Sequence, residues 1–325
     1  MTNRMSYSLL LILLCSYAVA QPTTSLRWQC VDSLYGPLPK GVHVFKSISP
    51  IDGKPNVAYY VSAELKSPEI DFDTQVGRGN RYTPSQYYQQ EGKPLVVVNG
   101  TFFSFADNRN LNLVIRRGML QAYNVPTVRL SKDTLRYYYL SRSAIGINKH
   151  RQADVTWLFT DTASKYAYNL INGPSQGIGP KADPNWAELR TQLKSGGRKK
   201  LRWKMETAIG GGPVLLQQGQ VYITNKEERM FVTGENDKHP RTAMGYTYDG
   251  RLIILAVEGR RPGQADGASL VQTAEILKAL GCKEALNLDG GGSSCLLVNG
   301  KATIQPSDKE GERPVPAVFM ITTRK

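Results

Sequence analysis

The hydrophobic positions of the chain fall mainly into short runs that end at turn-forming residues. The run Leu95 to Val98 stops at Asn99-Gly100, which is typical of a buried strand that delivers its last residue to a turn. Such runs indicate a chain rich in strands. Further strands are expected at Tyr59 to Leu65, Leu252 to Val257 and Val315 to Thr322, with hairpin turns at Arg117-Gly118, Asp249-Gly250 and Asn299-Gly300.

Two segments carry helix signals instead. Asp183-Pro184 supplies a capping acid and a proline suited to the first helical turn, which predicts a helix over Trp186 to Leu193. A second helix is expected from about Gly267 to Leu280, because Leu270, Ala274 and Leu277 form an apolar stripe at helical spacing and Gly281 stops it.

The second helix stands between the predicted strands 252–257 and 285–288, an order that reads as a β-α-β unit. Hairpins elsewhere add antiparallel pairs to this unit. We therefore expect an α+β (mixed α/β) fold, with a strand-rich mixed sheet, flanking helices and the β-α-β unit in the C-terminal half.

The first twenty residues have the pattern of a secretory signal peptide. Arg4 precedes the apolar run Leu9 to Leu14, and Ala18-Val19-Ala20 forms an A-x-A cleavage site before Gln21. Residues 1–20 are thus expected to be removed, leaving 21–325 as a single catalytic domain that is secreted or periplasmic. No later stretch reaches the ~20 apolar residues of a membrane span, so no integral membrane segment is expected.

The charge and the residue counts of the chain limit the ligands and metals that it is expected to bind. The chain has 41 Lys and Arg against 27 Asp and Glu, a formal net charge of +14, which favours phosphorylated or acidic glycans outside the cell. No nucleic-acid-binding module accompanies this charge, so no nucleic-acid partner is expected. Only three histidines occur, far apart, which makes a zinc site improbable. We interpret Cys282 and Cys295 as buried apolar fillers, although a disulfide between them stays open.

The most informative segment begins with Asp289, a carboxylate at the end of a predicted strand. Gly290, Gly291 and Gly292 leave their backbone N–H groups accessible, and Ser293 and Ser294 can donate further hydrogen bonds. A purely structural interpretation of this segment is a tight turn capped by the aspartate. Three consecutive glycines exceed what such a turn needs, so we favour an anion-binding nest.

Other strand ends carry candidate site residues. Glu258 follows the predicted strand 252–257, just as Asp289 follows the predicted strand 285–288. The two carboxylates could form an acid pair for glycoside hydrolysis. Alternatively, Glu258 could form an ion pair with Arg260 or Arg261. Arg241-Thr242 suits phosphate recognition. The remaining candidates are the amide Asn99, the nearby aromatic Phe103, and Gly211 and Gly212, where either a ligand or another backbone could approach closely.

Five segments in this order resemble the motifs of the phosphodiester glycosidase family, across about residues 40 to 323. The segments are Val97-Val98-Asn99-Gly100-Thr101-Phe102-Phe103, Ala208-Ile209-Gly210-Gly211-Gly212-Pro213, Arg241-Thr242-Ala243-Met244-Gly245, Val257-Glu258-Gly259-Arg260 and Leu286-Asn287-Leu288-Asp289-Gly290-Gly291-Gly292-Ser293-Ser294. One departure is that the usual V-D-G-R has Glu258 in place of the aspartate.

The resemblance implies a hydrolase that cleaves a sugar-1-phosphodiester at the anomeric C–O bond, giving a free sugar and a phosphomonoester. On this hypothesis Asp289 is the nucleophile or base and Glu258 its partner. Arg241, Thr242 and the segment 290–294 hold the phosphate, with Arg260 among the binding residues. Carboxyl groups ~5 Å apart would favour retention and ~6.5–9.5 Å inversion.

Two other functions stay open. In the first, Asp289 and Glu258 hold Mg²⁺ or Ca²⁺ and water attacks phosphorus. In the second, the protein binds acidic envelope glycans without catalysis. The favoured function requires no cofactor and no metal. The sugar, the aglycone, the stereochemistry and the oligomeric state are not given by the sequence.

Overall fold

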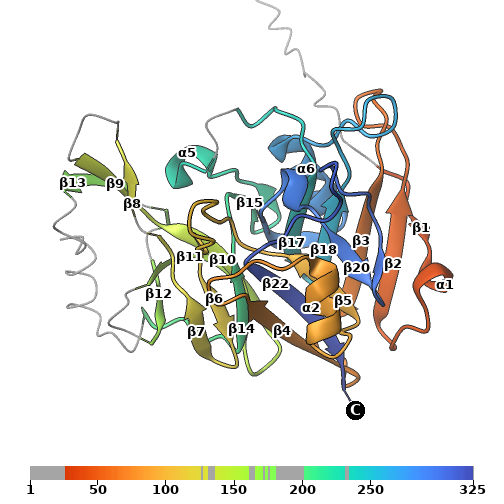
Figure 1. Cartoon of the computed structure of the whole chain (residues 1–325), viewed down its shortest axis with the longest axis horizontal. Coiled ribbons are helices and arrows are strands. Elements are labelled where there is room, and N and C mark those ends of the chain that lie inside the picture. Colours follow the sequence, from red (N-terminus) through yellow and green to blue (C-terminus); the bar gives the residue numbers. More distant parts are fainter. Residues whose placement is uncertain are drawn as a thin grey trace, which may run out of the picture.

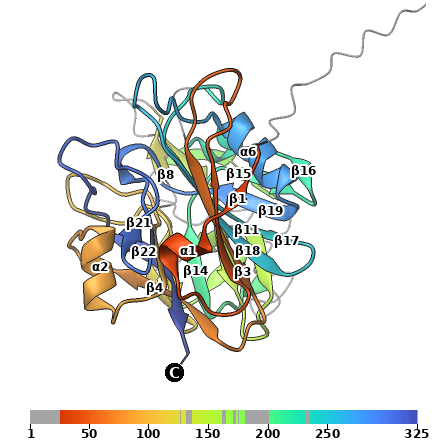
Figure 2. The ribbon, with the colours of Figure 1, turned by 90° about the vertical axis from the view of Figure 1, so that its right-hand side faces the viewer.

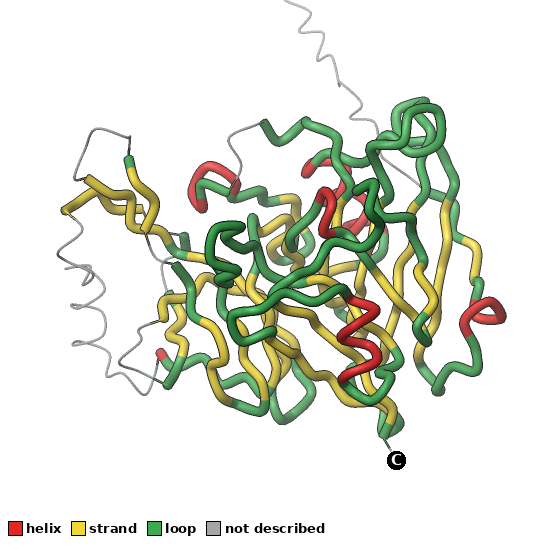
Figure 3. Tube along the Cα trace, in the orientation of Figure 1, coloured by secondary structure: helices red, strands yellow, loops and turns green. Residues whose placement is uncertain are grey.

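A computed structural model describes residues 26–125, 127–130, 136–160, 165–170, 173–174, 176–180, 201–230 and 234–324. The predicted signal peptide and the predicted helix over Trp186 to Leu193 lie outside these residues. Strands dominate the trace, and the longest described helix has ten residues (Figure 3). Among the described residues no helix is both long and apolar enough to cross a bilayer.

The strands form four sheets. The eight-stranded sheet has the order β1 (Gln29–Cys30), β2 (Val42–Ser47), β3 (Ala58–Glu64), β18 (Arg251–Val257), β17 (Arg241–Thr247), β19 (Cys282–Asn287), β15 (Val214–Gln217), β16 (Gln220–Val221). The five-stranded sheet has the order β21 (Lys301–Ala302), β20 (Leu296–Val298), β5 (Val96–Asn99), β22 (Ala317–Thr323), β4 (Ile70–Val76).

Two further sheets lie toward the left of Figure 1. The six-stranded sheet has the order β12 (Ala167–Asn169), β11 (Ala153–Thr160), β10 (Arg142–Ile147), β14 (Thr207–Gly210), β6 (Val114–Arg116), β7 (Met119–Ala122). The three-stranded sheet has the order β13 (Gln176–Pro180), β9 (Arg136–Leu140), β8 (Thr127–Arg129). The described α-helices are α1 (Asp32–Tyr35), α2 (Pro84–Gln90), α5 (Asn225–Glu228) and α6 (Leu270–Ala279).

The expected α+β fold with a mixed sheet is wrong: the fold is mostly β, and every described strand pair is antiparallel. The order β18, α6, β19 does occur as predicted. However, β17 lies between β18 and β19 and pairs antiparallel with both, so the β-α-β unit creates no parallel pair. The predicted strands and hairpin turns are otherwise found within a few residues of their expected positions.

The core follows from alternation along the strands. In β5, Val96 and Val98 face a central core shared by three sheets, whereas Val97 faces the opposite side beneath α2. In the same way α6 covers the outer face of the eight-stranded sheet through Ala274 and Leu277 (Figure 2). A capping box between Ser269 and Gln272 starts α6, and Gly281, with φ +79°, ends it.

The three cysteines among the described residues form no disulfide bond. Cys282 and Cys295 are free and buried, which confirms their interpretation as apolar fillers, and Cys30 is free and exposed.

Candidate active site

Several strands bring their polar ends to one edge of the molecule. Because β18 and β19 run in the same direction on either side of β17, Glu258 and Asp289 follow them at the same edge, where Arg241 begins β17. The predicted common edge is therefore present. Arg241 pairs with Val257, and Ala243 pairs with Asn287, which fixes this alignment.

Asn99, at the end of β5, joins three of these segments. Its Nδ2 donates to the main-chain oxygen of Asp289 at 2.6 Å. Its Oδ1 accepts from the Thr242 hydroxyl at 2.8 Å and from the Cys295 N–H at 3.0 Å. Asn99 and Thr242 are completely buried, so their polar atoms position the site and do not face solvent.

Asp289 is the partly exposed acid of this edge. Its Oδ1 accepts the N–H of Gly290 at 3.0 Å. Burial raises the pKa of Asp289 to about 7, and the Ser293 hydroxyl, the Gly290 N–H and the positive charge of Arg313 oppose that rise. A carboxyl with this pKa changes its protonation state at neutral pH, as a general base or acid requires.

The glycine-rich segment after Asp289 forms a short 3₁₀ turn, Gly291–Ser293. Most of its N–H groups bond within the protein: Gly291 donates to Pro240, Ser293 to Gly290, and Ser294 to Gly291. These donors are therefore engaged and are not presented as an open nest. The hydroxyl oxygens of Ser293 and Ser294 are buried; the Ser293 hydroxyl acts on the Asp289 carboxyl, and the Ser294 hydroxyl has no hydrogen-bond partner among the described residues.

Two guanidinium groups flank this turn. A Cβ on Gly291 would lie 3.0 Å from Arg260 Nη2, and Gly291 itself has φ +60°. A Cβ on Gly292 would lie 2.1 Å from Arg313 Nη2, where Arg313 makes a bidentate pair with Asp308 at 2.7 and 2.9 Å. The glycines thus let two cations approach the segment that follows Asp289. Arg260 is exposed.

Arg241 holds loops together from a buried position. Its Nε donates to Ala268 O at 2.9 Å and its Nη2 to Asp237 O at 2.8 Å. Burial lowers the pKa of Arg241 to about 10, which Asp237 opposes and Arg260 reinforces. The guanidinium fork thus bonds to backbone carbonyls at the same edge as Asp289.

Glu258 is also buried. Its Oε1 forms an ion pair with Arg261, and its Oε2 accepts the N–H of Gln305 at 3.0 Å. Of the two interpretations that the sequence left open for Glu258, the structure has the ion pair, with Arg261 as the partner. Both oxygens are engaged within the protein.

Comparison with known proteins agrees with this arrangement of motifs. A sequence profile of the phosphodiester glycosidase family matches residues 92–322. The chain belongs to the phosphodiester glycosidase family. This is a family of hydrolases.

Relatives of this phosphodiester glycosidase include N-acetylglucosamine-1-phosphodiester alpha-N-acetylglucosaminidase of Mus musculus, 32% identical over 109 residues. The matched segment covers 31% of this chain and only 21% of the mouse protein. The solved catalytic domain of the zebrafish enzyme, described as auto-inhibited by its pro-peptide, is similar with a TM-score of 0.57 and 21% identity, over 92% of this chain and 88% of that one. A putative exported protein of Burkholderia pseudomallei has a TM-score of 0.54 and 16% identity, over 85% and 75%. Both structures share the fold.

The second glycine segment of this phosphodiester glycosidase is packed inside the fold. Gly211 lies against the carbonyl of Asn287, which a Cβ would approach to 2.4 Å, and the Gly212 N–H donates to the same oxygen at 2.7 Å. The sequence left open a ligand or a second backbone at this point, and the backbone of β19 is what these glycines contact.

Glu228, which the sequence did not single out, supports this segment. It is completely buried, its carboxylate accepts five hydrogen bonds, and burial raises its pKa. A Cβ on Gly212 would come within 2.6 Å of its Oε2. The donors are the Ser143 N–H and hydroxyl, Trp157 Nε1, the Val214 N–H and the Thr224 hydroxyl, at 2.6 to 3.1 Å.

An aromatic and cationic wall is a further feature that sequence reasoning missed. Phe103, which was predicted, is nearly buried, but its neighbour Phe105 is 65% exposed with ring centroids 4.7 Å apart. Arg81 lies over both rings at 5.1 and 5.3 Å, and Arg313 lies 5.6 Å from the Phe105 ring. Because Arg313 also packs on Gly292, the wall adjoins the turn that follows Asp289.

Proposed function

We propose that this phosphodiester glycosidase hydrolyses a sugar-1-phosphodiester at the anomeric C–O bond and releases a free sugar and a phosphomonoester. The observation that carries the proposal is the carboxyl of Asp289, whose pKa burial raises to about 7, at the strand edge where two guanidinium groups flank the turn that follows it. A phosphomonoester is a good leaving group, so the reaction needs charge stabilisation more than a strong general acid.

Asp289 acts in this proposal as the base. It takes a proton from water while the water oxygen bonds to the anomeric carbon and the bond from that carbon to the phosphate oxygen breaks. The electron pair of the broken bond leaves with the phosphomonoester. Arg260 and Arg313 stabilise the negative charge of the phosphate, and the sugar packs against the exposed Phe105 ring. Asn99 and Thr242 fix the position of the Asp289 backbone.

The metal-assisted alternative requires two carboxylates directed at one cation. The Glu258 oxygens contact Arg261 and Gln305. This engagement is why we favour hydrolysis at carbon over attack at phosphorus.

Hydrolysis of a sugar-1-phosphodiester in ¹⁸O-labelled water tests the proposal. Attack at carbon places the label in the sugar, and attack at phosphorus places it in the phosphate. We expect label in the sugar, and a loss of at least ~10³-fold in kcat for Asp289→Asn, with Asp249→Asn, an exposed carboxylate in the turn at the far end of β17 and β18, as a matched control that retains most activity. Label in the phosphate, or an active Asp289→Asn protein, would overturn the assignment. Inversion at the anomeric carbon supports a base, and retention would make Asp289 the nucleophile.

We also propose that residues 1–20 direct export and are removed, so that the enzyme acts as a secreted or periplasmic protein. The basis is the charged start, apolar run and A-x-A site of the sequence. N-terminal sequencing of the protein recovered outside the cytoplasm should begin at Gln21. A protein that retains Met1 in the cytoplasm would contradict the proposal.

A further inference from the structure

A pocket of about 420 Å³ lies at the opposite end of β22 from the candidate active site. Gly100, next to the Asn99 hub, donates to Ala317 at the start of this strand, whereas Thr322 and Arg324 near its end line the pocket. At ~3.3 Å per residue, the seven residues of β22 separate the two places by about 20 Å. The C-terminus marks this end of the strand in Figure 1.

A second pocket of about 570 Å³ adjoins the first. The two share Asn148, Lys149 and Glu206 in their walls. Turns of the six-stranded sheet line both pockets, and β4 and the end of β22 from the five-stranded sheet also line the first, so the two pockets form one continuous surface, which we call the basic groove. Its residues come from β4, the β6–β7 and β10–β11 turns, the start of β12 and the residues before it, the segment before β14, and the end of β22.

Positive charge dominates the basic groove. Four Lys and Arg side chains line the first pocket and three more line the second, against three acids in total. Two of these acids already have partners: Asp71 pairs with Arg151 and Arg324, and Asp73 pairs with Arg116. Glu206 is the third acid.

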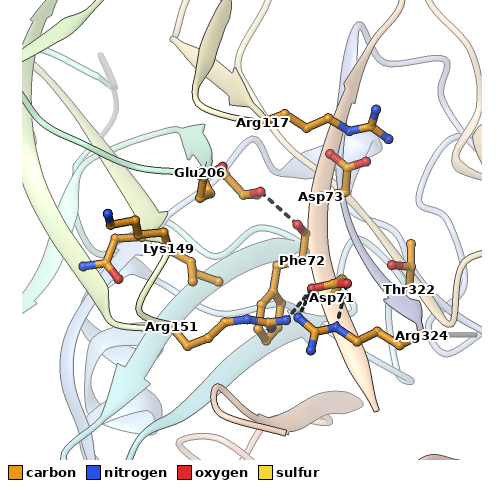
Figure 4. Close-up of a pocket in the computed structure, with 12 residues that line it drawn as sticks. Asp71, Phe72, Asp73, Arg117, Lys149, Arg151, Glu206, Thr322 and Arg324 are labelled. Carbon is orange, nitrogen blue, oxygen red and sulfur yellow. Dashed lines mark hydrogen bonds and ion pairs between the residues drawn. The ribbon is translucent and has the colours of Figure 1, made fainter. Parts of the chain in front are cut away.

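Several of the cations are available. The described part of the chain offers no ion-pair partner to Arg117, Lys149 or Lys204, all of which are exposed. Figure 4 shows Arg117 and Lys149 on two sides of the first pocket, with Arg151 and Arg324 gathered around Asp71 on a third. These positions suit a ligand that carries several negative charges along its length.

The inner wall of the first pocket is rigidly built. Arg151 Nη2 donates to Ile70 O at 2.9 Å, and its guanidinium lies 5.2 Å from the Phe72 ring centroid. Arg324 meets Asp71 with two hydrogen bonds at 2.8 and 2.9 Å. Arg151 Nη1 is buried and makes no hydrogen bond to the described residues.

The aromatic residues of the groove do not offer open faces for nucleic-acid bases. The Arg202 guanidinium lies 3.1 Å from the Tyr166 ring centroid and covers that face. Trp203 is buried, and its Nε1 donates to Asp154 at 2.7 Å. Single-stranded nucleic acids bind mainly through base stacking on open aromatic rings combined with a charged groove. Because the groove is basic but has no open aromatic ring for base stacking among its described residues, its ligand is better explained as a polyanion without aromatic groups than as a nucleic acid.

We propose that the basic groove is an exosite for a glycan polymer whose repeating units are joined by phosphodiesters. This proposal rests on the proposed function, because such a polymer contains the sugar-1-phosphodiester bond that the active site would cleave. The groove holds one stretch of the polymer while another reaches the Asp289 edge. Tethering raises the effective concentration of scissile bonds for a polymer and not for a small diester.

The test compares Lys149→Gln/Lys204→Gln with Lys66→Gln/Lys278→Gln, a control that removes the same charge from exposed lysines outside the groove. The groove variant should raise KM for a polymer of sugar-1-phosphate repeats by about fivefold or more, and leave kcat and the kinetics of a small sugar-1-phosphodiester unchanged. The control should leave all of these constants near wild type. Equal effects of the two variants would overturn the exosite.

A binding experiment separates this proposal from the proposed function. Asp289→Asn protein is titrated with poly(glycerol phosphate), neutral dextran, single-stranded DNA and double-stranded DNA at several salt concentrations. We expect salt-dependent binding of poly(glycerol phosphate), about tenfold weaker in the groove variant and with a shallower salt slope. No binding above that of dextran, or tighter binding of either DNA, would overturn the exosite. Binding by the Asp289→Asn protein, together with a wild-type protein that hydrolyses no sugar phosphodiester, would leave the exosite standing and remove the proposed function.

Discussion

The side chain of Asn99 donates to the main-chain oxygen of Asp289 at 2.6 Å, across 190 positions of sequence. Asn99 ends a strand of the five-stranded sheet, and Asp289 follows a strand of the eight-stranded sheet. This bond therefore ties the two sheets together at the point where the candidate catalytic carboxyl emerges. Because Asn99 also accepts from Thr242 and Cys295, one amide sets the position of three segments.

Replacing Asn99 by Ala should damage both stability and catalysis. The change leaves the buried Thr242 hydroxyl and Cys295 N–H without their acceptor, so we expect a loss of about 2–4 kcal/mol in the free energy of unfolding. It also frees the Asp289 backbone, so kcat should fall about 10–100-fold with a smaller change in KM. Denaturant unfolding and steady-state kinetics measure the two effects. Unchanged kcat in a folded Asn99→Ala protein would show that Asn99 does not position Asp289.

The raised pKa of Asp289 predicts a stability cost at neutral and alkaline pH. The carboxyl has a pKa near 3.8 when unfolded and about 7 when folded, so the folded state binds the proton more tightly. Its stabilising effect is complete below pH 3.8 and is lost as the pH rises toward and through 7. Asp289→Asn removes this loss. We expect the variant to be about 1–2 kcal/mol more stable than wild type at pH 8, a value reduced for the partial exposure of the group.

Unfolding of both proteins by denaturant at pH 5, 6.5 and 8 tests this. The advantage of Asp289→Asn should grow with pH across this series. An advantage that stays constant with pH would show that the carboxyl ionises with an ordinary pKa. The Asp249→Asn protein serves as a control for loss of an exposed carboxylate away from this edge.

Glu258→Gln should separate a structural from a catalytic carboxylate. Glutamine keeps an oxygen for the Gln305 N–H but loses the charge that pairs with Arg261. We expect a loss of about 1–2 kcal/mol in stability, because Arg261 loses its ion-pair partner but is 29% exposed, so water compensates for part of the loss. The shape of the pH profile of kcat/KM should stay as in wild type. Loss of one limb of that profile in a folded protein would instead make Glu258 an acid or base in the reaction.

The sequence predicted the strand ends of the site better than the way they pair. Apolar runs that stop at Asn99 and Asp289 placed both residues correctly at strand ends, since such a pattern depends only on local burial. The same runs carry no information about partners, so the position of β17 between β18 and β19 and the antiparallel sheets could not be read from them. Periodicity identifies a strand but not its neighbour.

The contacts of the charged side chains were harder to predict for a related reason. Arg241 bonds to the carbonyls of Ala268 and Asp237, and backbone carbonyls leave no signature in a sequence. Arg313 reaches the turn at Gly292 through a loop about twenty residues further along the chain, and no motif marks it. Phe105 could have been suspected, because it lies two residues beyond Phe103 in a segment already singled out.

Phe105 should contribute to substrate binding and little to stability. Its side chain is 65% exposed, so Phe105→Ala removes little buried surface and should change the unfolding free energy by less than about 1 kcal/mol. If the ring packs against the sugar, KM should rise about 5–30-fold while kcat changes less. Phe105→Tyr should restore most of the affinity. Tyr248→Ala, which removes another exposed ring, is the matched control, and an equal KM for all four proteins would exclude a sugar contact at Phe105.

Arg313 should set the pH at which the enzyme becomes active. As a base, Asp289 works only when deprotonated, so kcat/KM should rise tenfold per pH unit below its pKa and level off above about 7. The positive charge of Arg313 lowers that pKa. Arg313→Gln removes the charge, so the ascending limb should move to higher pH. The ratio of variant to wild-type kcat/KM should be several-fold lower at pH 6 than at pH 9, because at pH 9 Asp289 is ionised in both proteins.

The comparison of the two pH values distinguishes this effect from loss of a phosphate contact, which lowers kcat/KM by the same factor at every pH. In our proposal Arg313 both contacts the phosphate and lowers the pKa of Asp289. We therefore expect kcat/KM to fall by a constant factor at every pH and, in addition, the ascending limb to move to higher pH. Lys66→Gln, which removes a distant charge, should leave the limb in place. An Arg313→Gln limb at the wild-type pH, with only the uniform loss, would mean that Arg313 binds substrate without tuning Asp289. A limb displaced to lower pH would contradict the assignment of Asp289 as the titrating base, because removing a positive charge cannot favour an ionised carboxylate.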